Sequence, residues 1–596
     1  MATLGSLACG VGGERAARVV EDGALDAALG LLGHESPAVV AAALRAVKHL
    51  TASAAAGRRK VLGPAAVQRV VRLCGDGFDY GPGVFPDACD VVAQCCRGPE
   101  DQAAWLAGAA PPRADLLRAL VDGLGAVRGE RSSLGHESAV RGAFRAVCAL
   151  CEGNDHVAGH LLGSAGFLRA LWLSLRRGSA DEQLDAVRVV RTLRRAAGRV
   201  TLEARHGGAG PEPALPELLR SASQILQALV VAPPPGGPEH PAGVPERVSH
   251  ETARLWSASP ELQESPADPA VIHALVAELQ AHASSPPRAR GARGQLRGAL
   301  EALAALCAAG EDARRAALDA RASTPLLRAL DCPAPSVRAA ACRCLVSLAR
   351  SSAVLIQAFR DLPVLPPLVR SLHDPHPQVQ EEAAAVLCNL ATYHPPYKQE
   401  LVAPGCLGKI AEMAAQPDGR LKRTALLFLK NLAYDAQPPI KADILSHLPW
   451  VSGRRCRRRP GAGGRAGRPP HGAAVPRTRG AASRPAPRSP PRRPQRAMLG
   501  PLLEHADAKV QESTWGVLRN LASCTGGSQG RDGERVVQAV GWDALAGHLA
   551  RVTAPGGAPA ASRVLEHALY LVVNISASGG ASPDDGTRLL DRILER

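Results

Sequence analysis

The sequence predicts an all-α solenoid, that is, a right-handed superhelix of stacked helical repeats. The first observation is a period: Ala305, Ser347, Asn389 and Asn431 stand in the similar phrases AALC, VSLA, CNLA and KNLA at equal steps of 42 residues. The second is the helical spacing of apolar residues within each step. The third is composition, because a chain that is 46% hydrophobic but only 3% aromatic must build its core from small and aliphatic side chains. A step of about 40–47 residues is typical of armadillo and HEAT repeats.

The repeat that holds Asn389 shows the predicted elements most clearly. Residues 365–372 form a short amphipathic helix, and the turn at 374–377 follows it. A long helix comes next, because its apolar residues recur at helical spacing: Val379, Ala383, Val386, Leu387 and Leu390. Residues 398–402 form a third, brief helix. This three-helix pattern favours armadillo over HEAT repeats, and each repeat can bury its apolar stripe only against a neighbour.

The same criteria divide the chain into five segments. Armadillo repeats are predicted over residues 1–205, 295–450 and 498–596, and Asn574 lies in the last repeat. Residues 206–294 are expected to be irregular, because Pro/Gly-rich stretches flank one clear helix at 218–231 and the run 249–268 is polar. Residues 451–497 form an Arg/Pro/Gly-rich insertion. Without its 47 residues Asn520 would follow Asn431 by 42, so the insertion is expected to leave the stack intact.

Most of the positive charge lies in that insertion. The net charge is +16, but residues 451–497 hold fourteen Arg and no Asp, Glu or Lys, so the remaining chain carries only +2. The insertion has no aromatic residue on which bases could stack, which argues against nucleic-acid binding. RRCRRRP at 454–460 also fits a nuclear import signal. We predict that the insertion is disordered. Its composition also resembles GC-rich intron sequence read as protein, and sequencing of spliced transcripts tests that hypothesis.

Several function classes find no support in the sequence. No signal peptide opens the chain, and no apolar run is long enough to span a bilayer. The pairs Cys148/Cys151 and Cys342/Cys344 lack partner ligands at zinc-finger spacing, so we expect reduced core thiols and no metal site. No G-x-S-x-G, Walker A or HExxH motif occurs. The sequence therefore predicts no enzyme, no catalytic residue and no cofactor.

Three stretches carry a family resemblance: CCRGPEDQ at 95–102, VRAAACRCLVSLARS with the following FRD at 337–361, and IKADILSHL at 440–448. They are similar to the armadillo repeat-containing protein 8 family, and the resemblance runs in the same order from about residue 20 to 595. The resemblance implies a scaffold subunit of the CTLH complex, called GID in yeast, a multi-subunit ubiquitin ligase. Such a subunit links a substrate receptor to the catalytic RING and CTLH–LisH subunits for proteasome-dependent degradation, in cytoplasm and nucleus.

The chain departs from the family at two places. Family members continue for further repeats after the one that holds Asn574, and those repeats help to seat the substrate receptor. The C-terminal repeats of this chain are therefore expected to be truncated. The insertion at 451–497 is also foreign to the family, which agrees with a gene-model error.

The candidate protein-binding residues lie on the predicted long helices. An Asn recurs at one position of these helices: Asn389, Asn431, Asn520 and Asn574. Seven residues before the first three, on the same helix face, stand Glu382, Thr424 and Ser513. In an armadillo stack the long helices line the concave face, where an Asn ladder can bind the backbone of an extended peptide. The alternative is that each Asn bonds a neighbouring helix and shapes the stack.

A second function remains open, that of a peptide-binding adaptor of catenin or importin-alpha type. Importin-type adaptors place a Trp one helical turn before such an Asn, whereas Trp515 precedes Asn520 by five residues. A basic groove of the catenin kind finds weak support, because the cations on the long helices are scattered: Arg343, Arg420, Lys422 and Lys430. The ligase scaffold predicts ligase subunits as partners, and the adaptor predicts import receptors or cadherin-like tails. Neither requires a small-molecule substrate or a membrane.

Overall fold

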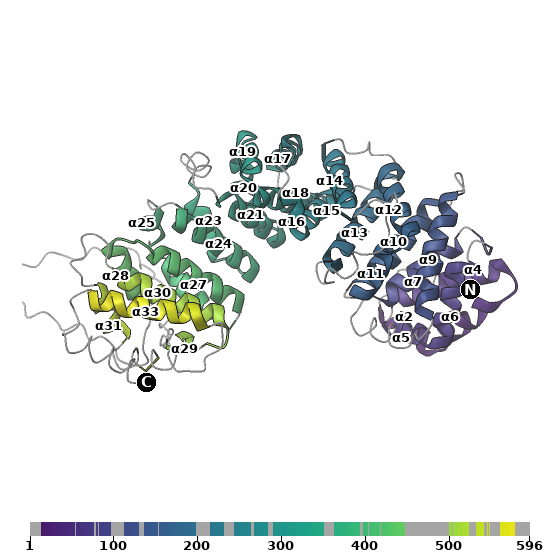
Figure 1. Ribbon diagram of the computed structural model, residues 1–596, viewed down its shortest axis with the longest axis horizontal. Coiled ribbons are helices and arrows are strands. Elements are labelled where there is room, and N and C mark those ends of the chain that lie inside the picture. Colours follow the sequence, from purple (N-terminus) through teal and green to yellow (C-terminus); the bar gives the residue numbers. More distant parts are fainter. Residues whose placement is uncertain are drawn as a thin grey trace, which may run out of the picture. The chain divides into compact units, whose positions relative to one another are not determined.

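The computed structural model describes residues 13–96, 112–129, 136–197, 215–231, 244–263, 267–283, 290–350, 363–447, 500–523, 532–548 and 561–577, except for 54, 77–78, 82, 153, 394–396, 403–404, 418, 504, 541–544 and 546. Within these ranges every regular element is a helix (Figure 1). The predicted all-α solenoid is therefore confirmed. The chain divides into two compact units, Met1–Val364 and Leu365–Arg596, hereafter unit 1 and unit 2.

The long helices of unit 1 lie side by side in chain order, each packed against the next. They are α4 (Pro37–Ser53), α7 (Val84–Cys95), α10 (His136–Cys151), α13 (Ala180–Ala197), α15 (Val244–Ala258), α18 (Arg290–Ala309) and α21 (Pro335–Leu348). This arrangement buries the apolar stripe of each helix against its neighbours, as the repeat period predicts.

A second layer of unit 1 packs on the long helices, one member on each. It contains α3 (Ala24–Gly30), α6 (Pro64–Gly75), α9 (Pro112–Gly129), α12 (Ala165–Arg177), α14 (Leu215–Val231), α17 (Pro269–Ala283) and α20 (Ser323–Ala329). Shorter helices complete the unit: α2 (Gly13–Glu21), η1 (Leu31–Gly33), α5 (Ala55–Val61), α11 (Asp155–Leu162), α16 (Pro260–Gln263) and α19 (Glu311–Asp319). Helices α19, α20 and α21 thus form a repeat of one short, one middle and one long helix.

The segment expected to be irregular, 206–294, contains four described helices, α14 to α17. In particular, α15 covers part of the polar run at 249–268 and takes the place of a long helix, packed between α13 and α18. Its sequence lacks a clean apolar period because Arg247 and Glu251 form ion pairs with α13, and His250 shares a hydrogen bond with Glu301 of α18. The divisions proposed from sequence after residues 205, 294, 450 and 497 stay predictions.

Unit 2 repeats the same arrangement. Its long helices α24 (Pro377–Tyr393), α27 (Gly419–Ala433), α30 (Ala508–Ala522) and α33 (Ala561–Ala577) pack in succession. The other described helices are α23 (Leu365–Leu372), α25 (Tyr397–Leu401), α26 (Cys406–Ala415), α28 (Pro438–His447), α29 (Gly500–Leu503) and α31 (Asp532–Val540). Although residues 451–497 separate α27 from α30 in sequence, the two helices pack directly, as the 42-residue step predicts. The insertion itself lies outside the described residues.

Small side chains let the long helices approach closely. A Cβ atom on Gly142 of α10 would lie 3.2 Å from the backbone of Pro86 in α7, closer than most such contacts. Ala, Leu and Val fill most of the core. The largest fully buried aromatic side chains of the described residues are Trp256, Trp515, Phe85, Phe144, Phe167 and Phe428. None of the described helices is both long and apolar enough to cross a lipid bilayer.

Long helices of unit 1 are capped by the helix that follows them. The last carbonyl groups of an α-helix have no partner within the helix. Side chains seven residues later donate to such carbonyls at three places: Arg58 to Thr51 (3.2 Å), Gln263 to Trp256 (3.2 Å) and Arg314 to Cys307 (2.7 Å). The short helix therefore fixes the end of the long helix before it.

A candidate protein-binding surface on unit 2

The structure places the four candidate Asn residues on consecutive long helices. Asn389 lies on α24, Asn431 on α27, Asn520 on α30 and Asn574 on α33, each within about one turn of the helix end. Because these helices pack in succession, the four side chains follow one another across unit 2.

The amide groups bond the stack in a regular way. Asn520 Nδ2 donates to the carbonyl oxygen of Lys430 at 2.8 Å, and Asn574 Nδ2 donates to that of Arg519 at 3.0 Å. Each acceptor directly precedes the Asn of the previous long helix. Both belong to the last turn of their helix, and the Lys430 carbonyl also accepts a hydrogen bond from Tyr434 N. These two Asn residues therefore cap the neighbouring helix, which agrees with the structural alternative stated from sequence.

Asn431 follows the same register with different acceptors. Its Nδ2 donates to Thr392 Oγ1 at 2.7 Å and to Cys388 Sγ at 3.1 Å, and Cys388 directly precedes Asn389. Both contacts lie on α24. The Asn ladder thus ties α24, α27, α30 and α33 together.

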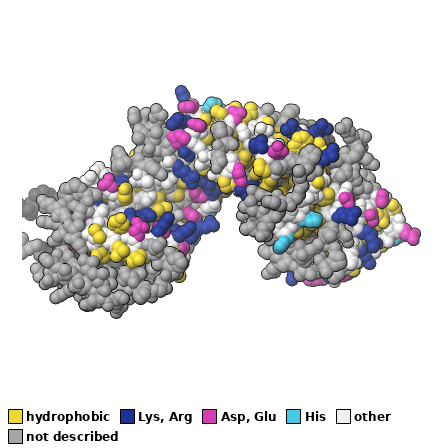
Figure 2. Space-filling view, viewed as in Figure 1, with side chains coloured by type: hydrophobic (Ala, Val, Ile, Leu, Met, Phe, Trp, Pro, Cys, Tyr) yellow, Lys and Arg dark blue, Asp and Glu magenta, His cyan; other side chains and the backbone are white. Residues whose placement is uncertain are grey.

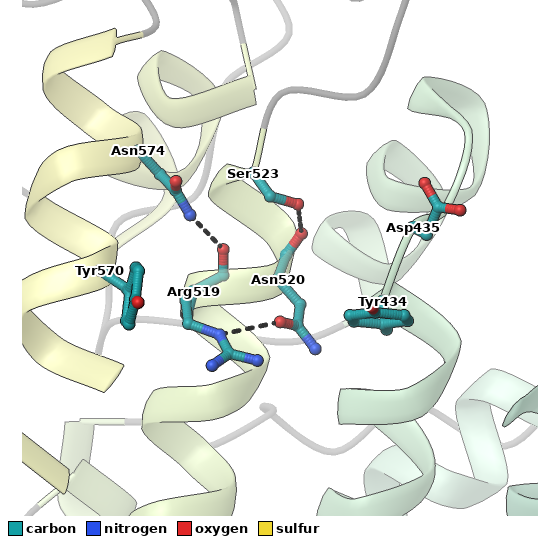
Figure 3. A pocket seen from close by; sticks show the side chains of 7 residues that line it. All are labelled: Tyr434, Asp435, Arg519, Asn520, Ser523, Tyr570 and Asn574. Carbon is teal, nitrogen blue, oxygen red and sulfur yellow. Dashed lines mark hydrogen bonds between the residues drawn. The ribbon is translucent and has the colours of Figure 1, made fainter. Parts of the chain in front are cut away.

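A pocket of about 340 Å³ opens where α27, α30 and α33 end (Figure 3). Seven residues line it: Tyr434, Asp435, Arg519, Asn520, Ser523, Tyr570 and Asn574. Figure 3 shows Tyr434 and Tyr570 on opposite sides, with Arg519 and Asn520 between them. Tyr434 is 63% exposed and Tyr570 53% exposed, so both rings are available to a partner. Of the candidate residues, only Asn520 and Asn574 line this pocket.

The turn after α27 supplies one side of the pocket. Tyr434 N donates to the carbonyl groups of Lys430 and Asn431, which ends the helix. Asp435 then adopts a φ of 48°, the left-handed conformation in which Asp is tolerated better than most residues. The exposed positions of the Tyr434 ring and the Asp435 carboxylate follow from this helix end.

Arg519 gives the pocket a positive charge. Its Nε donates to Asn520 Oδ1 at 3.1 Å, and its Nη1 lies 3.0 Å from Nδ1 of the buried His567. Burial, together with the charges of Arg519 and Lys430, lowers the pKa of His567. A neutral imidazole accepts the hydrogen bond from Arg519, so the cation stays at the pocket wall. Asp435 supplies the one carboxylate among the residues that line the pocket.

Exposed apolar side chains continue the surface along α33. Leu569, Tyr570 and Val573 are 45%, 53% and 59% exposed. Over α33 the space-filling view shows hydrophobic side chains beside Lys and Arg (Figure 2). The sequence pattern did not single out Tyr434 or Tyr570. Tyr570 stands four residues, or about one helical turn, before Asn574, and this spacing could have indicated it.

The other candidate residues lie elsewhere on the long helices. Glu382, Thr424 and Ser513 are half-buried, two turns before the Asn positions, and do not line the pocket. Trp515 is fully buried in the core. The structure thus separates a pocket at the helix ends from the rest of the predicted face.

The paired thiols are core residues. Cys148, Cys151, Cys342 and Cys344 are buried. Burial raises the pKa of Cys148 to about 12 and also raises those of Cys151 and Cys344, which disfavours the reactive thiolate. Among the described residues, no group of three or more His, Cys, Asp or Glu side chains is placed to hold a metal ion.

Comparisons with known proteins agree with this architecture. The armadillo/beta-catenin-like repeat family model matches residues 352–392. A crystal structure of an engineered protein aligns over 83% of this chain and 98% of its own, with a TM-score of 0.51 and 17% identity, which supports the fold alone. This chain carries an armadillo repeat.

Known proteins resemble part of this chain in sequence. Armadillo repeat-containing protein 8 from Mus musculus is 30% identical over 112 residues, and its Xenopus laevis counterpart is 30% identical over 151 residues. GID complex subunit 5 from Schizosaccharomyces pombe is 27% identical over 153 residues. These matches cover 19%, 25% and 26% of this chain and 17%, 21% and 19% of the relatives. The matched stretch thus spans about a fifth of the relatives' length, and over it the predicted resemblance is confirmed.

Proposed function

We propose that this armadillo solenoid is a non-catalytic scaffold subunit of a CTLH/GID-type ubiquitin ligase. In this role it binds a substrate receptor and the catalytic RING and CTLH–LisH subunits, and it acts in cytoplasm and nucleus. The observation that carries the proposal is the similarity to both armadillo repeat-containing protein 8 and GID complex subunit 5. The fold supports it, because stacked helices present an extended surface to several partners.

The mechanism is geometric. Two partners bound to one scaffold encounter each other within a single complex. This raises the effective concentration of the substrate lysine near the conjugating enzyme. The scaffold itself contributes no reacting group in this proposal. Its contribution is binding surface, and rigidity from the Asn ladder that ties α24 to α33.

The pocket of unit 2 is the proposed docking site for an extended segment of one partner subunit. Exposed Tyr residues contribute large contact area at low entropic cost. Asn520 lies between Tyr434 and Tyr570, and Asn574 lies one turn after Tyr570 on α33, so both amides line the pocket where they can meet a peptide backbone. Their donation to Lys430 and Arg519 leaves one N–H of each amide for such a contact.

Affinity purification of the full chain from cells, followed by mass spectrometry, tests the proposal. We expect RING and CTLH–LisH subunits to co-purify with the chain. Recovery of import receptors or cadherin-like tails in their place would support the peptide-binding adaptor and overturn the scaffold.

The pocket is tested in the same experiment with the Tyr434→Ala/Tyr570→Ala variant. We expect this variant to lose one partner while retaining the others. Val231→Ala is the matched control, because Val231 is an exposed apolar side chain of unit 1, 47% exposed. If the double variant recovers every partner in unchanged amount, the pocket is not a docking site, whereas the scaffold role stands.

A further inference from the structure

Side chains from three long helices of unit 2 meet at a buried imidazole. His567 of α33 is 8% exposed, and its Nδ1 lies 3.0 Å from Nη1 of Arg519 on α30. Gly516 of α30 makes room for a third group, because a Cβ atom there would lie 2.6 Å from Cδ of Lys430 on α27 and 3.6 Å from Cδ2 of His567. The bare backbone at Gly516 therefore lets the Lys430 side chain and the imidazole both lie against α30.

The hydrogen bond between Arg519 and His567 fixes the protonation state of the imidazole. A guanidinium only donates hydrogen bonds, so Nδ1 is the unprotonated acceptor and the ring proton lies on Nε2. Burial favours this neutral form, because the charged form loses its hydration. The charges of Arg519 and Lys430 favour it further, and together these effects lower the pKa of His567 from 6.5.

Carboxylates near His567 offset only part of this effect. Glu512 of α30 and Glu566 of α33 raise its pKa, but burial and the two cations outweigh them. Glu512 also lies 3.7 Å from Arg563, and Glu566 is exposed to solvent. The charged side chains of α31, which also packs on α33, bond each other or neighbouring side chains: Asp532, Glu534 and Arg535.

Protonation of His567 would break its bond with Arg519. The new N–H at Nδ1 would point at a donor, and two like charges would lie 3.0 Å apart in a buried site. The imidazole is held inside the helix stack, whereas Arg519 is half-buried and lines the pocket (Figure 3). The guanidinium is therefore the group that moves, toward the open pocket.

We propose that the bond between Arg519 and His567 is a pH-sensitive latch between α30 and α33. The latch is closed while the imidazole is neutral and opens when the imidazole takes up a proton. Opening weakens the contact between the two helices and releases the Arg519 guanidinium into the pocket, where Asp435 is the one carboxylate among the lining residues. The latch depends on neither the docking role of the pocket nor membership of a ligase.

The direction of the effect follows from proton binding. In the packed state His567 has a lower pKa than the 6.5 of a solvated imidazole. Between those two pH values the open state holds a proton that the closed state lacks, so the contact between α30 and α33 loses stability as pH falls. Each unit by which packing lowers the pKa multiplies the open population by about ten once the pH lies below both values.

Hydrogen–deuterium exchange of the full chain between pH 8 and pH 4.5 tests the latch, with labelling times scaled to cancel the intrinsic pH dependence of exchange. We expect peptides from α30 and α33 to exchange faster as pH falls below 6.5, and peptides from α26, which contains no His, to keep their rate. The amide oxygen of a His567→Gln variant can accept from Arg519 at every pH, so this variant should lose the acceleration. An equal acceleration in His567→Gln, or a constant rate in the unaltered chain, would overturn the proposal.

The midpoint pH of this transition provides the second measurement. Lys430→Met removes one cation beside the imidazole and keeps the apolar stem, so the midpoint should rise by about 0.3–0.7 pH unit. This variant retains His567, so it tests the latch even where His567→Gln disturbs packing. His273→Gln is the matched control, because it removes an exposed imidazole from α17 of unit 1 and should leave the midpoint unchanged. An unchanged or lower midpoint in Lys430→Met would contradict the latch.

Discussion

Single side chains of unit 2 complete the hydrogen bonding of neighbouring helices. Asn520 is 5% exposed and its Nδ2 donates to the Lys430 carbonyl at 2.8 Å. The last turn of α27 therefore depends on a residue that lies far along the chain, beyond the insertion. An Asn at this position serves the fold whether or not a peptide also binds.

Asn520→Ala tests this role directly. The substitution removes the side-chain donor of the Lys430 carbonyl, which keeps only the hydrogen bond from Tyr434 N, so we expect a loss of about 1 kcal/mol in the free energy of unfolding. Urea denaturation followed by circular dichroism measures it. Ser513→Ala, on the same helix and half-buried, is the control and should change stability by less than about 0.5 kcal/mol. Equal effects of the two variants would contradict the capping role.

Glu278 on α17 is a second residue, and its burial lowers the free energy of unfolding when its carboxyl group is ionised. Burial raises the pKa of its carboxyl group from 4.5 to about 7, although a hydrogen bond with Gln295 lowers it. Its Oε1 is buried and has no hydrogen-bond partner among the described residues. The native state therefore favours the protonated form more than the unfolded chain does.

The sign of the resulting pH dependence follows from proton binding. Between pH 4.5 and about 7 the native state holds a proton that the unfolded state has released, so stability falls as pH rises through this window. Glu278→Gln removes the titration. We expect it to stabilise the protein at pH 8 by about 1–3 kcal/mol and to have little effect at pH 4.5. Urea denaturation of both proteins at the two pH values measures the difference, and a pH-independent difference would contradict the assignment.

The sequence revealed some of the pocket-lining residues better than others for physical reasons. The Asn positions were visible because a polar residue in an apolar period is conspicuous. Tyr434 and Tyr570 were missed because periodicity does not tell an exposed aromatic ring from a core one. Trp515 is the opposite case, an aromatic residue near a candidate Asn whose ring is fully buried in the core.

At the scale of elements, buried lysines join short helices to the next long helix. Lys398 of α25 donates to the Tyr434 carbonyl, and Lys441 of α28 donates to the Ser523 carbonyl. Both acceptors follow directly after a long helix. Lys441 also pairs with Asp532 of α31 at 3.2 Å, and both side chains are 1% exposed. These contacts hold α28, α30 and α31 together across the insertion.

Breaking the Lys441–Asp532 pair should be costly. Lys441→Met leaves the Asp532 carboxylate buried with only the half-exposed Arg535 nearby, at 3.4 Å, so we expect a loss of about 3 kcal/mol. Lys441→Met/Asp532→Asn removes both charges and should recover most of that loss. Thermal and urea unfolding of unit 2 in the full chain measure both. Exposed Lys509→Ala is the control, and a double variant as unstable as the single one would contradict a charge-based cost.

Helix α15 shows where sequence patterns fail at the element scale. Glu251 and His250 are shielded from solvent by their contacts with α13 and α18, so they occupy positions that apolar residues hold in other long helices. A pattern that counts apolar residues therefore reads the segment as polar and irregular. The 42-residue step, in contrast, predicted the packing of α27 on α30 across 47 intervening residues.

At the scale of the whole molecule, the period predicts the stack but not its division. The step from Ser347 to Asn389 runs through the boundary between Val364 and Leu365, so periodicity carries no signal of two units. Charge acts at this scale too. Because the chain outside 451–497 carries only +2, its surface chemistry is local, as the aromatic pocket on unit 2 illustrates.

The scaffold role is tested most directly by co-expression of the full chain with the RING and CTLH–LisH subunits of a CTLH/GID ligase, followed by size-exclusion chromatography. The account predicts one stable complex that contains all of them in fixed ratio. Elution of the chain alone, with the ligase subunits assembled without it, would contradict the account.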